Sequence, residues 1–368
     1  MNNYDLVYNY LSLLNIKGIS HKSIVNLVKS LGGLGNIFKI ETRFLKDAGL
    51  NENQIELIKS GKIDEKFVED ELVMIKKNNI RMLLFEDKDY PRMLKEIDDP
   101  PAILYTYGNI ETMGRPSLSV VGSRRASVNA IKFAKKLSSE LGEIGFNIVS
   151  GYASGIDINA HLGAIEKGTT TAVFGNGLLV VYPSQHKKYL KEICEKGCII
   201  SELPLKEQPN AHNFPKRNRI ISGLSYGVIV VEAYEQSGSL ITAKLAIDYG
   251  RDLFAVPTWP ENHNTGTNKL IKEGAKLIEN YLDVVGEYAA IFDFLKDVDK
   301  KDNNTIISLN DEGNKLLEII KNSPCSVDEL CIKSGLPTSD ILSILTEMEL
   351  DDLVFLNSDG RYSIKNRR

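Results

Sequence analysis

Hydrophobic residues between Ser117 and about Val285 occur in short continuous runs separated by amphipathic stretches of ten to sixteen residues. The runs are SLSVVG, FNIVSG, TTAVFG, CIISELP, GVIVVEA and DLFAVP. Continuous apolar strands that alternate with helices predict βαβ units and a parallel sheet covered on both faces. Right-handed crossovers then give a doubly wound, Rossmann-like α/β domain, which we place at residues 117–290.

Residues 1–75 have a different pattern, with apolar positions at helical spacing. A helix, a glycine turn at Gly18 and a second helix are followed by a similar set around Gly49. The arrangement resembles helix-hairpin-helix (SAM-like) modules, in which backbone N–H groups at the second helix hold a phosphate. A small packing module is the favoured alternative, because Ser20 stands where a second glycine is usual.

Three further segments complete the predicted organisation. Residues 76–116 form a connector with a strand candidate at Ile80–Phe85 and the paired prolines Pro100 and Pro101, which we expect to fix an inter-domain path. Residues 291–309 form a charged linker. Residues 310–368 contain three helices and two short strands, which predicts a winged helix, with Ser326 and Glu329 as a capping box.

Bulk composition narrows the class of protein. The 368 residues carry a net charge of -4 with pI about 5.9, so any polyanion site must be a local concentration of Lys and Arg. Four cysteines are too few for a disulfide framework at this length. No apolar run approaches the ~20 residues needed to cross a bilayer, and the N-terminus does not resemble a secretory signal. A cytoplasmic protein without a membrane partner is expected.

Glycine-rich turns follow four of the predicted strands. Ligands of open α/β sheets bind at the carboxyl ends of the strands, so these turns predict an anion-binding rim. The candidate binding residues in three of the turns are Gly122, Ser123, Arg124, Ser150, Gly151, Gly155, Gly238, Ser239 and Thr242. The turn after the third strand is Gly175-Asn176-Gly177.

The segment Asn213–Arg219, NFPKRNR, places three cations beside Pro215, where a helix is expected to begin. The helix dipole disfavours positive charge at this end, so the cations make sense where an anion binds. Phe214 is placed to stack on a base. The candidate nucleic-acid-binding residues here are Phe214, Lys216, Arg217, Asn218 and Arg219, and we expect Arg124 and Arg217 on the surface.

Catalytic motifs are not found in the sequence. Neither GxxxxGK[ST] nor GxGxxG occurs, and the five histidines have no metal-site spacing. We therefore predict no catalytic residue, no metal and no cofactor. His161 lies one helical turn from Asp157, where hydrogen bonding that holds the loop is favoured over acid–base chemistry.

The order of the motifs resembles the DNA-processing protein A (DprA, also Smf) family of bacteria. The resemblance covers about Asp87 to Ile278 and rests on VVGSRRAS, VSGYASGIDINAHLGAI, TAVFGNGLLVVYP, HNFPKRNRIISGLS and VVEAYEQSGSLITAKLA. It implies a homodimer that binds single-stranded DNA (ssDNA) non-specifically and helps load the RecA recombinase, in DNA uptake, natural transformation and recombination. It also implies a basic groove that uses Arg124, Lys216, Arg217 and Arg219. Ser154 replaces an arginine common in the family, so the groove holds fewer charges here.

Two other classes of function stay open at this stage. A nucleotide-processing enzyme of the phosphoribohydrolase kind has a similar glycine-rich rim, although only Glu232 and Glu235 are available as bases. A protein-only adaptor is the other. The segment Thr338–Asp352 has five acidic residues and no Lys or Arg, which disfavours groove reading by the winged helix and favours a protein contact or an architectural role.

Overall fold

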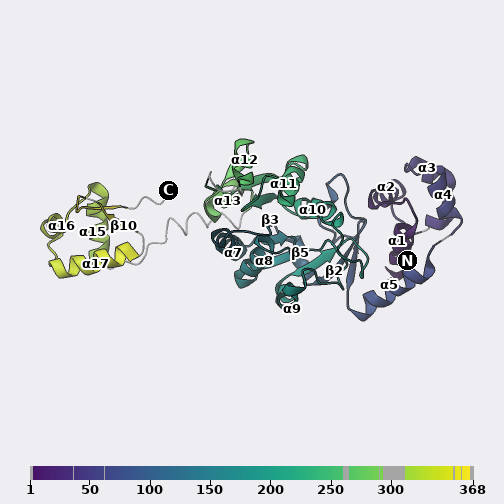
Figure 1. Cartoon of the computed structure of the whole chain (residues 1–368), viewed down its shortest axis with the longest axis horizontal. Helices are drawn as coiled ribbons and strands as arrows, with labels where there is room; N and C mark the ends of the chain where they lie inside the picture. The colour runs from purple at the N-terminus through teal and green to yellow at the C-terminus, as the bar shows by residue number, and fades with distance from the viewer. Residues whose placement is uncertain are drawn as a thin grey trace. The chain divides into compact units, whose positions relative to one another are not determined.

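The chain forms two compact units, residues 1–295 and 296–368 (Figure 1). The structure, a computed structural model, describes residues 3–35, 37–61, 63–259, 265–289, 291–292, 311–350, 353–357 and 359–364. Most of the predicted linker 291–309 therefore lies outside the described residues. Across the described parts of both units, every helix is too short or too polar to cross a bilayer.

The first unit begins with five helices: α1 Asn3–Asn15, α2 His21–Leu31, α3 Thr42–Asp47, α4 Glu52–Lys59 and α5 Glu65–Lys77. Gly18 and Gly49, in the two predicted hairpins, both have φ of +87°, the left-handed region that favours glycine. Ser20 caps α2, since its hydroxyl accepts the N–H of Ser23 at 3.1 Å. The side-chain amide of Gln54, at the start of α4, donates to the Gly18 carbonyl at 2.6 Å and ties the two hairpins together.

A nine-stranded sheet in the order β1-β2-β6-β5-β4-β3-β7-β8-β9 forms the centre of this unit. The strands are β1 Arg81–Leu84, β2 Ile103–Gly108, β3 Ser117–Val121, β4 Asn147–Ser150, β5 Thr169–Val173, β6 Cys198–Ser201, β7 Gly227–Val230, β8 Asp252–Ala255 and β9 Lys276–Leu277. From β6 to β9 every pairing is parallel. The four residues of each of β4, β6 and β7 are all buried, which is why these strands appear as continuous apolar runs.

The predicted connector differs from the expectation, because it supplies two strands of the sheet. Strand β2 pairs antiparallel with β6, and β1 pairs antiparallel with β2. The paired prolines lie outside the strands, just before β2. Buried residues of the first helices, such as Leu13 and Ile24, belong to the same hydrophobic core as Leu104 of β2.

Helices cover both faces of the parallel strands. Figure 1 shows α7, α8 and α9 on one side of the sheet and α10 and α11 on the other. Their bounds, with the remaining helices, are α6 Arg92–Lys95, α7 Val128–Glu143, α8 Ile156–Lys167, α9 Lys187–Lys196, α10 Asn213–Gly223, α11 Gly238–Asp248, α12 Gly266–Lys272 and α13 Tyr281–Tyr288. The doubly wound Rossmann-like prediction is confirmed.

The second unit is a winged helix. It contains α15 Asp311–Asn322, α16 Val327–Ser334, α17 Thr338–Leu350 and the antiparallel pair β10 Val354–Leu356 and β11 Tyr362–Ile364. The predicted capping box is present: the Ser326 hydroxyl accepts the Glu329 N–H at 3.3 Å, and the Glu329 carboxylate accepts the Ser326 N–H at 3.0 Å. Of the five acidic residues of the third helical segment, Asp351 and Asp352 lie outside the described residues.

Candidate nucleic-acid interface

Strand order reverses at the contact between β3 and β7 in the parallel part of the sheet. Strands β4, β5 and β6 continue from β3 in one direction, and β7, β8 and β9 continue in the other. The turns after β3 and β7 therefore diverge at their carboxyl ends and leave a crevice, which is where open α/β sheets bind ligands.

A cavity of about 650 Å³ occupies this crevice. We call it the rim cavity, and its lining includes Val121, Gly122, Ser123, Arg124, Arg125, Asp157, Tyr182, Phe214, Arg217, Asn218, Tyr234, Gln236, Gly238, Ser239 and Thr242. An adjacent hollow of about 400 Å³ shares Arg124, Arg125, Tyr182 and Phe214 with it. Arg124, Arg125 and Arg217 line the rim cavity, and Asp157 is the one carboxylate among the described residues of its lining, so these residues carry a surplus of positive charge.

Two glycines are required by the close packing of the turns. Gly155 has φ of +78°, and a Cβ there would lie 2.2 Å from the carbonyl oxygen of Ser123. A Cβ on Gly122 would lie 2.9 Å from the carbonyl oxygen of Glu232. The Ser123 N–H donates to that same carbonyl at 2.7 Å. Glycine here allows three turns to meet, so Gly155 shapes the cavity without lining it.

The exposed Arg124 and the half-buried Phe214 form one part of the cavity wall. The Arg124 guanidinium lies over the Phe214 ring, 5.5 Å from its centroid. Tyr182, 43% exposed, lies on the same ring with centroids 5.7 Å apart. Gly175 explains how the ring fits, because a Cβ there would lie 2.7 Å from Phe214 Cδ1. A cation and two aromatic rings are thus presented together, as ssDNA-binding grooves require.

Arg217 is buried, and the prediction of a surface side chain is wrong. It is 5% exposed, and Nη1 donates to the carbonyl of Gly151 at 2.8 Å and to that of Val173. These carbonyls follow β4 and end β5, so the guanidinium joins two strand ends. Nε donates to the Asn218 side chain at 3.2 Å, and the Asn218 amide donates to the Gly238 carbonyl at 3.2 Å.

Asp157, at the start of α8, is buried close to Arg217, and the charges of the two groups are coupled. Burial raises the pKa of Asp157, while Arg217 and backbone N–H groups of the turn oppose the rise. Burial lowers the pKa of Arg217 to about 10, and Asp157 opposes that shift. The Arg217 guanidinium is therefore charged at neutral pH, and its hydrogen bonds are made inside the protein.

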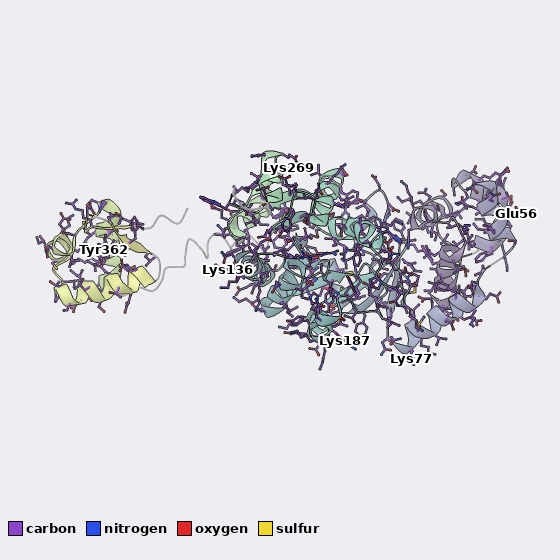
Figure 2. The ribbon with its side chains drawn as sticks, in the orientation of Figure 1. Glu56, Lys77, Lys136, Lys187, Lys269 and Tyr362 are labelled. Carbon is purple, nitrogen blue, oxygen red and sulfur yellow. The ribbon has the colours of Figure 1, made fainter. Side chains whose placement is uncertain are left out.

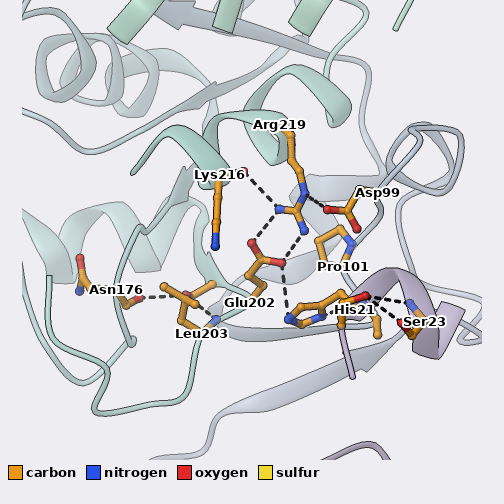
Figure 3. A network of polar contacts seen from close by, with 12 residues as sticks. His21, Ser23, Asp99, Pro101, Asn176, Glu202, Leu203, Lys216 and Arg219 are labelled. Carbon is orange, nitrogen blue, oxygen red and sulfur yellow. Dashed lines mark hydrogen bonds and ion pairs between the residues drawn. The ribbon is translucent and has the colours of Figure 1, made fainter. Parts of the chain in front are cut away.

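Arg219 and Lys216 do not line the rim cavity. Arg219 is 8% exposed and forms a bidentate ion pair with Glu202, with distances of 2.7 and 2.6 Å (Figure 3). Lys216 is exposed on the same side of α10. The expectation that the three cations of NFPKRNR share one groove is wrong, because residues two apart on a helix point about 200° apart at 3.6 residues per turn.

Some of the remaining predicted residues line a cavity, and others are buried in the fold. Gly238, Ser239 and Thr242 line the cavity where α11 begins, and the positive end of that helix dipole faces it. Gly151 lines the adjacent hollow. Ser150 is fully buried, and its hydroxyl donates to the Val120 carbonyl at 2.6 Å, so it joins β4 to β3.

Sequence reasoning missed Arg125, Tyr182, Tyr234, Gln236 and the role of Asp157. Arg125 directly follows Arg124 and lines both hollows, so the doubled arginine was itself a signal. Tyr182 lies in the loop after β5, at the end of the motif TAVFGNGLLVVYP, and was given no role there. Figure 2 shows Lys136, Lys187 and Lys269 at separate edges of the first unit, so these exposed lysines are scattered.

The two candidate catalytic bases face elsewhere. The Glu232 carboxylate accepts the Ser127 N–H at 3.0 Å and holds the start of α7. Glu235 is exposed and accepts the Thr265 hydroxyl at 3.2 Å. Neither is among the residues that line the rim cavity. His161 bonds the Thr170 hydroxyl at 2.6 Å, whereas Asp157 interacts with backbone N–H groups of its turn and with the charge of Arg217.

These features define a Rossmann-like α/β protein with a positively charged, aromatic-walled cavity at its switch point and a separate winged helix. The sequence profile of the family described as DNA recombination-mediator protein A matches residues 81–289, and that of the DprA winged helix domain matches residues 301–358. The chain belongs to the DNA recombination-mediator protein A (DprA/Smf) family.

Individual relatives agree with this assignment. Protein Smf of Escherichia coli is 33% identical over 319 residues, which cover 84% of each chain. Protein Smf of Synechocystis sp. is 42% identical over 212 residues, 55% of this chain and about half (53%) of that protein. The crystal structure of DNA processing protein A from Streptococcus pneumoniae has a TM-score of 0.69 and 34% identity, and covers 76% of this chain and 97% of that one.

A structure of DNA processing protein A from Helicobacter pylori, which describes that protein's ssDNA binding mode, has a TM-score of 0.52 and 31% identity. The match covers 60% of this chain and 96% of that one.

Proposed function

We propose that this protein binds ssDNA non-specifically along the rim cavity. The observation that carries the proposal is the group formed by the exposed Arg124 and Tyr182 and the half-buried Phe214 at the switch point, beside the N-terminus of α11. Cationic side chains and helix N-termini bind phosphates, and exposed rings stack on bases of any sequence. The ssDNA binding of the H. pylori relative supports the same ligand here.

Different side chains have different parts in this proposal. Arg124 and Arg125 contact phosphates, Phe214 and Tyr182 stack on bases, and Gly238 and Ser239 offer the helix terminus. Arg217 and Asn218 hold these groups in position, since their polar atoms form hydrogen bonds with backbone carbonyls and with each other. Lys216 is placed to meet the strand outside the cavity.

The protein acts as a mediator and not as an enzyme in this proposal. Neither carboxylate candidate lines the cavity, and Asp157 is buried close to Arg217. We further propose that it works in the cytoplasm as a homodimer and helps load RecA onto the bound strand, in DNA uptake and recombination. These steps rest on membership of a recombination-mediator family.

A titration with single- and double-stranded oligonucleotides at two salt concentrations tests the ligand. We expect preference for the single strand, little dependence on base sequence and weaker binding at high salt. Preference for the duplex, or no binding to either, would contradict the proposal, and the second result would favour a protein-only adaptor. Release of base or phosphate from AMP, abolished by Glu232→Ala or Glu235→Ala, would favour a nucleotide-processing enzyme. Light scattering tests the dimer, because a monomeric mass at micromolar concentration would contradict it.

A further inference from the structure

A buried polar cluster joins the first helices to α10 on the side away from the rim cavity. Arg219 of α10 holds Glu202, which directly follows β6, through two charged hydrogen bonds. Glu202 also lies 3.6 Å from the Nε2 of His21, the first residue of α2 (Figure 3). Arg219 Nε reaches Asp99 at 3.3 Å.

The cluster closes into a ring through the connector. The Ala102 N–H donates to His21 Nδ1 at 3.0 Å, and Ala102 lies three residues after Asp99. Because Nδ1 accepts this bond, the hydrogen of a neutral imidazole is on Nε2 and faces the Glu202 carboxylate. Residues from α2, the connector, the end of β6 and α10 are thus tied together.

Arg219 is the cation of this ring and faces two carboxylates, Glu202 and the half-exposed Asp99. The Glu202 and Arg219 side chains are each only 10% exposed. Burial would raise the pKa of Glu202, but its charged surroundings, Arg219 among them, hold the pKa below its usual value. Burial lowers the pKa of His21, so the imidazole is neutral at pH 7. If Arg219 left this site for a phosphate, the Glu202 carboxylate would stay buried without its partner, which is strongly unfavourable.

The opposite side of α10 carries the rim-cavity residues Phe214, Arg217 and Asn218. A helix moves as one body, so whatever fixes Arg219 also fixes these side chains. Glu71 of α5 adds a second link between the N-terminal helices and the sheet. It accepts the Tyr105 hydroxyl at 2.9 Å and the N–H of Leu205 at 3.2 Å, and Leu205 lies three residues after Glu202.

We propose that Arg219, Glu202 and His21 form a clasp through which the N-terminal helices hold α10 in its binding position. Arg219 is then a positioning residue and not a phosphate contact. The first hairpin, whose second helix α2 begins directly after Ser20, docks on the sheet domain and does not hold DNA. The effect on ssDNA rests on the proposed function, whereas the mechanical coupling does not.

Hydrogen exchange of the full-length protein tests the coupling without DNA. Amide exchange reports local opening. In Glu202→Gln and His21→Ala we expect the amides of α10 to exchange about tenfold faster. In Arg219→Lys we expect the same increase for the amides of α2. A change of about tenfold lies within the range by which coupled sites usually influence each other. Exchange in α7 and in the winged helix should match wild type. Unchanged exchange in α2 of Arg219→Lys and in α10 of His21→Ala would overturn the clasp.

Salt-dependent ssDNA titration then separates positioning from phosphate contact. Arg219→Lys and Glu202→Gln should weaken binding about tenfold with an unchanged slope of log affinity against log salt, because no phosphate contact is lost. Arg219→Ala should be weaker than Arg219→Lys, since lysine keeps the charge but not the two-pronged bond. Arg124→Ala is the comparison, with a shallower slope.

A shallower slope in Arg219→Lys, with unchanged hydrogen exchange, would make Arg219 a DNA contact and refute the proposal. If wild type binds no ssDNA, the proposed function fails, while the exchange experiment still decides the clasp. Arg92→Ala, on the exposed surface of α6, is the matched control and should leave both measurements unchanged.

Discussion

The rim of the sheet and helix α17 of the winged helix are both candidates for nucleic-acid contact, but their charges are opposite. Among the residues that the structure describes, three arginines and one carboxylate line the rim cavity. Helix α17 presents Asp340, Glu347 and Glu349 on its exposed surface. Its segment Thr338–Asp352 contains no Lys or Arg. A net charge of -4 therefore hides a cationic site in one unit and an acidic surface in the other.

The rim also differs from α17 in where its charges lie. Arg217 and Asp157 are buried and hold the strand ends, while Arg124 is exposed and available to a ligand. The acidic residues of α17 named above are all exposed. Substitutions at the rim should thus have effects that range from loss of stability to loss of affinity, whereas those in α17 should be mild.

Replacement of Arg217 with Ala should have the largest effect. It removes the donor to the buried carbonyls of Gly151 and Val173. Each buried group left without its partner costs about 1–3 kcal/mol in the free energy of unfolding, which urea denaturation measures. The exposed Arg124→Ala should stay within about 0.5 kcal/mol of wild type. Equal stabilities would show that Arg217 does not support the rim.

Acid should destabilise the first unit through its histidines, and all five histidines precede residue 296. Burial lowers the pKa of His161 to about 3 and also lowers that of His186. The unfolded chain then takes up these protons first, so stability is complete above about pH 6.5 and falls as the pH drops toward 3, by up to about 1.4 kcal/mol per pH unit for each group.

Unfolding measured from pH 7 to pH 5 in wild type and in histidine variants separates this effect from carboxylate titration, which these proteins share. His161→Gln should make the loss of stability with falling pH shallower than in wild type. His212→Gln, at an exposed position, is the control and should keep the wild-type dependence. An identical dependence in all three proteins would contradict the assignment.

Replacement of Arg124 with Ala should weaken ssDNA binding without unfolding the protein. Loss of one phosphate contact makes the plot of log affinity against log salt shallower by about 0.7 for a single strand. The loss should be similar for every sequence, because phosphate contacts carry no base information. Circular dichroism checks the fold. An unchanged slope would place the strand elsewhere, with the hairpin at Gly49 as the next candidate.

The doubly wound sheet and the rim turns were predictable, because buried parallel strands produce continuous apolar runs and their turns need glycine. The different directions in which Arg217 and Arg219 of NFPKRNR point were not predicted from the sequence, although helical geometry already separates the two residues. The partners that bury them, Asp157 and Glu202, come from distant segments that no local pattern joins. Strand β2 was missed as part of the sheet for the same reason: its partner β6 is about ninety residues away.

Removal of the winged helix by truncation after about Lys296 should have the smallest effect. The two units are separately compact, so the first should keep its fold without the second. An acidic α17 repels phosphates, and groove-reading helices are basic or neutral, so its loss removes no favourable contact. We expect ssDNA affinity within about twofold of the full chain, with the same salt slope, since each phosphate contact would add about 0.7 to that slope. A tenfold loss of affinity would show that the winged helix contacts DNA through a surface other than α17. Both units would then bind DNA, and they would differ in which surface they use and not in whether their charge allows binding.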